Sequence, residues 1–233
     1  MVGFWDRIDN IYCISVDSRN DRRAEARVQF DRLGIGDRVE FVIVPKHPSD
    51  CEQGIYESHL LCMQKGLAAG AERILIFEDD VIFDRFDGDI LARLADFIER
   101  YPGWHMLFLG CMVSRSRRTG YPSVRCINYR SLTHAYVVHR EFAAFILAHP
   151  WQKIPYDDFL KRLDDDRMYV AYPSIAFQSA SPSDNDRYLP LDRFRRICGG
   201  LRVLQTRNEF YYRHRLIIIV GHVAAVLLLL KAL

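Results

Sequence analysis

The feature that most constrains this fold is the segment at residues 73–83, RILIFEDDVIF, in which three consecutive acids stand between two apolar runs. Large apolar residues in a run of this length are typical of a buried sheet strand, and the acids mark the point where the strand ends. Carboxylates this close together repel one another unless a cation binds them. Their hard oxygen atoms suit Mg²⁺ or Mn²⁺, ions that usually also hold phosphate. The segment therefore predicts a metal site, with an acidic turn exposed to water as the alternative.

Apolar periodicity and turn residues divide the chain into alternating strands and helices. Extended segments are predicted at 10–17, at 38–44, in the run that ends at the acids 78–80, and at 104–109, 133–139 and 168–178. Helices are predicted at 20–34, 56–69, 88–100 and 140–148, and a further helix is expected to start at 155. Residues 112–130 hold five arginines and are expected to form an exposed loop or hairpin. Residues 181–186 are expected to form a polar loop.

Strand and helix alternate four times, which predicts an α/β fold with a mainly parallel sheet covered by helices on both faces. Ligands of such sheets gather beyond the carboxyl ends of the strands. Asp17 and the acids at 78–80 both fall at such ends. The acidic cluster is therefore expected to line a binding site.

The C-terminal segment differs from the rest of the chain. Residues 192–215 carry seven arginines against two acids, and residues 216–230 contain eleven Leu, Ile or Val. As a helix, the apolar segment spans roughly 22 Å and is apolar all round, which is short of a hydrocarbon core of about 30 Å. The aromatic and basic collar at 210–215 suits anionic headgroups. We expect attachment to a membrane surface, by partial insertion or as a tilted span, with a buried core helix or a dimer contact as the alternative.

The remaining composition excludes some classes of protein. A net charge of +2 gives no argument for nucleic acid, and no nucleic-acid partner is expected. The six cysteines include no C-x-x-C pair, which argues against a zinc ribbon or a redox motif and favours a reducing cytoplasm. The N-terminus lacks the basic and apolar regions of a signal peptide.

Several short blocks of the chain, taken together, resemble glycosyltransferase family 25, whose members include lipopolysaccharide, lipooligosaccharide and collagen galactosyltransferases. The blocks occur in the family's order over roughly residues 10–186. They are Ile11 to Asp17 with Arg19, Asp21, Arg22 and Arg23; Gly54-Ile55 with Ser58-His59-Leu60; Ile74 to Asp80; His134-Ala135-Tyr136; Asp157 or Asp158; and Ser183-Asp184. The chain departs from the family pattern at Ser15, where Asn is usual, and at Tyr56-Glu57, where smaller residues are usual.

The resemblance implies a GT-A fold, a UDP-sugar donor and inverting transfer. Asp80 is expected to bind the metal directly, with Glu78 and Asp79 on the ribose or on metal-bound water, and Asp79 as the second candidate ligand. The predicted donor contacts are Asp17, Arg22, Arg23, Ser58, His59, Glu78, Asp79 and His134, and the candidate bases are Asp157, Asp158 and Asp184. The structural alternatives are helix solvation for the arginines, packing for the histidines and helix capping for Asp157 and Asp158. Asp184 is also a candidate for the metal shell, and His134 for a second metal ligand or a diphosphate contact.

The sequence thus predicts a metal-dependent hexosyltransferase that moves galactose or another hexose from a UDP-sugar to a cell-envelope glycan such as lipopolysaccharide core. We expect a catalytic domain at 1–191, a basic interfacial connector at 192–215 and a membrane segment at 216–233, at the cytoplasmic face of a bacterial inner membrane. One rival is a nucleotidyltransferase, although residues 17–23 lack the Gly-rich phosphate loop of that class. The other is a non-catalytic, membrane-tethered module that binds a nucleotide sugar or a glycan.

Overall fold

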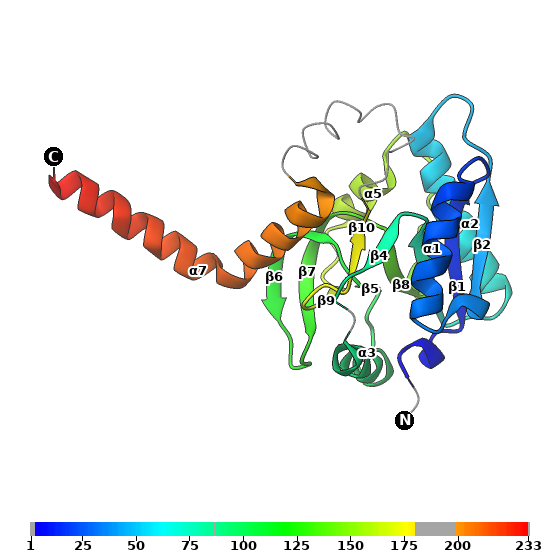
Figure 1. Cartoon of the computed structure of the whole chain (residues 1–233), viewed down its shortest axis with the longest axis horizontal. Coiled ribbons are helices and arrows are strands. Elements are labelled where there is room, and N and C mark those ends of the chain that lie inside the picture. The colour runs from blue at the N-terminus through cyan, green and yellow to red at the C-terminus, as the bar shows by residue number, and fades with distance from the viewer. Residues whose placement is uncertain (1–2, 86, 180–198, 233) are drawn as a thin grey trace.

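The structure is a computed structural model that describes residues 3–85, 87–179 and 199–232. A sheet of eight strands lies at its centre, and a long C-terminal helix projects from one side (Figure 1). The strands of this sheet are β1 (Asn10–Val16), β2 (Val39–Val44), β3 (Arg73–Glu78), β5 (Met106–Phe108), β6 (Met112–Arg118), β7 (Val124–Ser131), β8 (Ala135–His139) and β9 (Met168–Ala171). A second, two-stranded sheet pairs β4 (Val81–Phe83) with β10 (Ala176–Gln178).

The helices follow the predicted alternation with the strands. They are α1 (Asn20–Arg32), α2 (Cys51–Ala68), α3 (Gly88–Arg100), α4 (Arg140–Leu147), α5 (Tyr156–Leu163) and α7 (Gly200–Ala232), with single 3-10 turns at Trp5–Arg7 and Gly36–Arg38. Helix α2 begins at Cys51, five residues before the predicted start. The carboxylate of Asp50 caps it by accepting from the backbone amides of Glu52 at 2.9 Å and Gln53 at 3.3 Å.

The eight strands are ordered β2-β1-β3-β8-β5-β9-β7-β6. Their pairings show that six of the eight run in one direction, while β7 and β8 run in the other. The predicted α/β class with a mainly parallel sheet is therefore confirmed. The arginine-rich segment at 112–130 forms the β6–β7 hairpin, which was one of its two predicted alternatives.

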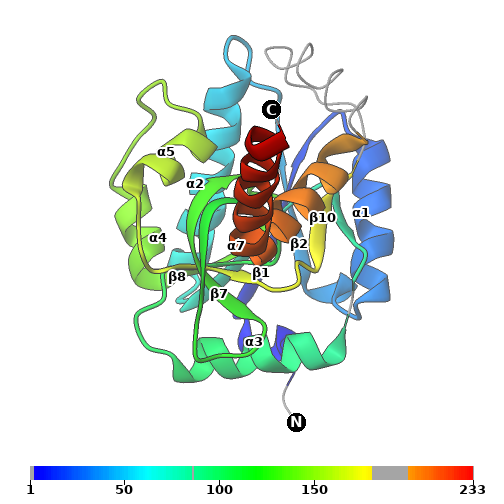
Figure 2. The ribbon, with the colours of Figure 1, turned by 90° about the vertical axis from the view of Figure 1, so that its left-hand side faces the viewer.

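Both faces of the sheet are buried, which explains the uninterrupted apolar runs in the sequence. Along β3, Leu75 and Phe77 pack in one core with α1 and α3, and Ile74 and Ile76 pack in the other with α2, α4 and α5. Figure 2 shows α1 on one side of the sheet and α2, α4 and α5 on the other. Because successive side chains of a strand point to opposite faces, a strand buried on both sides must be apolar at every position.

Helix α7 is continuous from Gly200 to Ala232, so the predicted connector and membrane segment form one helix from residue 200 onward. Its first turns pack against the domain: Gln205 donates to the carbonyl of Ala176 at 3.0 Å, and Asn208 exchanges two hydrogen bonds with the backbone of Val113. Beyond these turns the helix leaves the domain, and Leu216 is 79% exposed. By length and composition α7 is able to cross a membrane.

Candidate functional site

A cleft of about 430 Å³ lies at the carboxyl ends of β1, β2 and β3, where the sequence predicts a site. Its walls are the N-terminal half of α2, the connection between β7 and β8, the start of α5, the end of β10 and the first residues of α7. Among the side chains that line it are Arg22, Ser58, His59, Glu78, Asp79, Asp80, Thr133, Asp157, Asp158 and Gln178. A volume of this size is typical of small-molecule sites.

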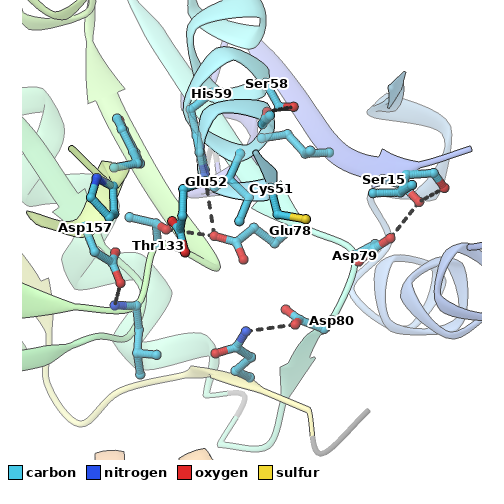
Figure 3. A pocket seen from close by; sticks show the side chains of 18 of the residues that line it. Ser15, Cys51, Glu52, Ser58, His59, Glu78, Asp79, Asp80, Thr133 and Asp157 are labelled. Atoms are coloured by element: carbon cyan, nitrogen blue, oxygen red, sulfur yellow. Dashed lines mark hydrogen bonds and ion pairs between the residues drawn. The ribbon is translucent and has the colours of Figure 1, made fainter. Parts of the chain in front are cut away.

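Glu78 is held at the end of β3 by side chains from α2 and from the residues before β8 (Figure 3). Thr133 donates to its Oε1 at 2.8 Å, and Nε2 of His59 lies 3.6 Å from the same atom. His59 is fully buried, with its Nδ1 2.9 Å from the Tyr136 hydroxyl and its ring stacked on Tyr156. Burial alone would raise the pKa of Glu78, but His59 and Thr133 lower it below the ordinary value. The carboxylate therefore stays ionised in a fixed position.

Asp79 and Asp80 point toward different partners, and both contact the guanidinium of Arg22. Asp79 accepts from the Ser15 hydroxyl at 2.6 Å and from Nη1 of Arg22 at 3.2 Å, and Asp80 accepts from Gln178 at 2.8 Å. The same Arg22 nitrogen lies 3.4 Å from Asp80. Burial raises the pKa of Asp79, and it raises that of Asp80 to about 7. Arg22 thus supplies part of the positive charge that the acidic cluster requires.

The fit of a divalent ion differs between the two predicted ligands. Both carboxylate oxygens of Asp79 are engaged, whereas Oδ1 of Asp80 is buried with no hydrogen-bonding partner among the described residues. Within the same residues no group of three His, Cys, Asp or Glu side chains could hold a metal ion. Mg²⁺ commonly binds through one or two carboxylates together with water and substrate phosphates. The residues present therefore fit an ion held by Asp80 and a bound diphosphate.

Asp157 lies in the first turn of α5, across the cleft from Asp79 and Asp80 (Figure 3). The Tyr129 hydroxyl donates to its Oδ1, and the backbone amide of Leu132 donates to its Oδ2 at 3.2 Å. Neither bond caps its own helix, so the capping alternative does not describe this residue. Burial raises the pKa of Asp157 to about 6. Asp158 also lines the cleft, and the third candidate base, Asp184, lies outside the described residues.

Arg23 and Asp17, two of the predicted donor contacts, do not line the cleft. Arg23 donates to the carbonyls of Val16 at 2.6 Å and Asp17 at 2.7 Å, and so holds the turn between β1 and α1. The exposed Asp17 carboxylate accepts from the amide of Ser18 at 2.6 Å. Because adjacent residues of a helix point about 100° apart, Arg22 faces the acids while its neighbour Arg23 faces the turn.

Ser58 and His134, two further residues predicted to contact the donor, lie in different surroundings. Ser58 lines the cleft, where its hydroxyl donates to the carbonyl of Gly54 at 2.6 Å. His134 is fully buried outside the cleft lining, and burial lowers the pKa of its ring. Its backbone carbonyl accepts from the amide of Glu78 at 3.0 Å. His134 thus supports the end of β3 through its main chain.

Sequence reasoning did not single out Thr133 and Gln178, which hold Glu78 and Asp80. The pairing of Phe77 with Ala135 places the residues before Ala135 beside the end of β3. This register brings Thr133 to Glu78, and only the fold reveals it. Ser15 was visible in the sequence as a departure from the family pattern, and it contacts Asp79.

Two curated proteins are similar to this chain. A glycosyltransferase 25 family member from Aedes aegypti is 25% identical over 128 residues, which is 44% of this chain and 21% of that protein. The human inactive glycosyltransferase 25 family member 3 is 31% identical over 121 residues, which is 49% of this chain and 20% of that protein. The match thus spans about a fifth of the length of either relative. These relatives confirm the predicted resemblance to glycosyltransferase family 25, although no family model matches the chain.

Solved structures are similar to this chain at low identity. A197 from STIV aligns with a TM-score of 0.45 at 15% identity, over 72% of this chain and 83% of that one. A glycosyltransferase involved in the glycosylation of the major capsid of PBCV-1 aligns with a TM-score of 0.45 at 14% identity, over 81% of this chain and all of that one.

Proposed function

We propose that this protein is an inverting glycosyltransferase that moves a hexose, in the first instance galactose, from a UDP-sugar to a glycan acceptor at a membrane. The observation that carries the proposal is the position of Asp80 and Asp157 on opposite walls of one cleft (Figure 3). Transfer from a nucleotide diphosphate needs a clamp on the diphosphate and a base for the acceptor hydroxyl. In an inverting reaction, these two groups act from opposite sides of the sugar.

The clamp is assigned to the acids at the end of β3. Oδ1 of Asp80 has no hydrogen-bonding partner among the described residues, and Glu78, held by Thr133 and His59, would accept a hydrogen bond from a ribose hydroxyl. A divalent ion bound at Asp80 would neutralise the departing diphosphate as a Lewis acid. Arg22 offsets part of the negative charge of the cluster.

The base is assigned to Asp157. A general base works best when its pKa lies near the working pH, and a pKa of about 6 leaves this carboxylate mostly ionised at neutral pH. The Tyr129 hydroxyl and the Leu132 amide fix its orientation. Each carboxylate oxygen has a second lone pair, which remains available for the acceptor hydroxyl.

The acceptor is assigned to a membrane-bound glycan, of which lipopolysaccharide core is one example. The apolar part of α7 is exposed from Leu216 to Leu230, and burying it in lipid removes a large apolar surface from water. Attachment would bring the cleft to a lipid-linked acceptor by local encounter. We place the protein at the cytoplasmic face of a bacterial inner membrane, in accord with its scattered cysteines.

Donor binding tests the proposal. Calorimetric titration with UDP-galactose and UDP-glucose, each with Mn²⁺ and with EDTA, would compare the wild type with Asp80→Asn. We expect Mn²⁺ to strengthen binding to the wild type but not to Asp80→Asn. Asp89→Asn, an exposed acid on α3 outside the cleft, is the matched control and should behave as the wild type does. Equal affinities for wild type and Asp80→Asn under both conditions would refute the assignment.

A second candidate is a non-catalytic module that binds the nucleotide sugar without transferring it. It is favoured by the name of the human relative, which calls that protein inactive, and by the engagement of both oxygens of Asp79 with the protein itself. Donor hydrolysis separates the two candidates. A transferase should release UDP slowly from the donor in the presence of Mn²⁺, whereas the module should bind the donor without turnover.

A further inference from the structure

The free edge of the large sheet is strongly basic. In the part of the chain that the structure describes, strand β6 ends the sheet and pairs only with β7, and it carries the exposed side chains of Arg115, Arg117 and Arg118. None of the three forms an ion pair with a carboxylate in the described part of the chain. Charged residues on an edge strand also discourage pairing with other chains, so these arginines alone do not identify a ligand.

The basic edge continues onto helix α7 across one aromatic ring. The guanidinium of Arg125, from β7, lies 4.1 Å from the ring centre of Tyr172, and that of Arg213, from α7, lies 6.0 Å from the same centre. Two like charges that approach one ring repel each other, and cation–π attraction offsets only part of that repulsion. Protection of an edge strand does not account for this arrangement, because neither residue belongs to β6.

The direction of α7 shows what this surface faces. The helix leaves the domain on the side of β6, at the opposite end of the sheet from β2 (Figure 1). Its exposed apolar segment begins at Leu216, directly after the exposed Arg215. A bilayer that holds this segment would therefore lie on the β6 side of the domain.

We propose that a set of six arginines docks on the anionic lipid headgroups of the bilayer that holds α7. This set, here called the basic edge, consists of Arg115, Arg117, Arg118, Arg125, Arg213 and Arg215. The inference rests on the membrane attachment given under the proposed function and deepens it by naming the lipid. Lipid phosphates balance the charge of these guanidinium groups, and a guanidinium fork matches phosphate geometry. Docking at the edge and insertion of α7 together hold the domain in one orientation on the membrane.

Hydrogen–deuterium exchange of the full-length chain in lipid nanodiscs tests this orientation. One set of discs contains only phosphatidylcholine, and the other contains about 30% phosphatidylglycerol. Each arginine close to an anionic surface raises the binding constant for that surface by a factor of about five. We therefore expect exchange over residues 112–131 to be at least about five-fold slower in the anionic discs. The difference should disappear in about 1 M NaCl, where the Debye length falls to about 3 Å.

Two double variants separate the basic edge from net charge. Arg115→Gln with Arg117→Gln should markedly reduce the slowing, whereas Arg27→Gln with Arg32→Gln, which removes the same charge from exposed positions on α1, should preserve it. Thermal unfolding in detergent would confirm that both variants are folded.

Three outcomes would overturn the proposal. Equal exchange in the two kinds of disc would show that the edge does not meet the headgroups. The same slowing in phosphatidylcholine discs on addition of inositol hexakisphosphate would assign the surface to soluble polyanions such as a phosphorylated glycan. Failure of the chain to enter either disc would refute membrane attachment itself. UDP-galactose binding, measured on the same samples, tests the enzymatic proposal separately.

Discussion

Tyr129→Phe removes the hydroxyl that donates to Asp157 and leaves the aromatic ring in place. A hydrogen bond to a charged group contributes about 1.5–3 kcal/mol, and one pKa unit corresponds to about 1.4 kcal/mol. The lost bond stabilised the ionised carboxylate, so the pKa of Asp157 should rise by about one to two units from its value of about 6. At pH 7 the ionised fraction would fall from about nine-tenths to between about a half and a tenth.

Initial rates of UDP-sugar turnover across the pH range would measure this shift. Because the ionised form is the base, the rising limb of the profile should move to higher pH by the same one to two units. The rate at pH 7 should fall about two- to ten-fold and recover at higher pH. Tyr101→Phe is the matched control, since the Tyr101 hydroxyl contacts Tyr169 and lies away from the cleft. An unmoved limb in a folded Tyr129→Phe protein would show that Asp157 is not the base.

Two further predictions concern α7. In Gly110→Ala, the new Cβ would lie 2.0 Å from the carbonyl oxygen of Ala176 and 2.6 Å from the Gln205 amide nitrogen. We therefore expect the free energy of unfolding, measured in urea, to fall by about 1–3 kcal/mol. The control Gly120→Ala, whose Cβ meets nothing within 4 Å, should lose much less. Deletion of the residues after Tyr212 should move the folded protein from the membrane pellet to the soluble fraction, and continued pelleting would contradict the membrane role.

The sequence was most informative where burial acts on every residue of an element. The runs that became β1, β3 and β8 are apolar because each is covered on both faces, and they were predicted close to their observed bounds. Helix α2 was predicted to start too late, because its first turns, around Gly54, carry few apolar residues. The cap at Asp50 was a readable signal for its true start.

The site was less predictable, because its geometry depends on strand register and side-chain direction. The sequence located the acids at 78–80 and the pair Asp157 and Asp158, but it gave no means of separating Asp157 from Asp158 or Arg22 from Arg23. Gln178 reaches Asp80 from 98 positions away along the chain, through the pairing of β10 with β4. No local pattern encodes such a contact.

The unbroken course of α7 sets a limit on the reach of the proposed enzyme. Leu201 forms part of the cleft wall, and Leu216 opens the apolar segment fifteen residues later on the same helix, a rise of about 22 Å. A flexible tether would let the cleft sample many heights above the lipid. A helix of fixed length instead sets the largest height, which the bend in α7 and any tilt reduce (Figure 1). Acceptors would then be selected by how far their terminal sugar stands from the bilayer, as well as by its chemistry.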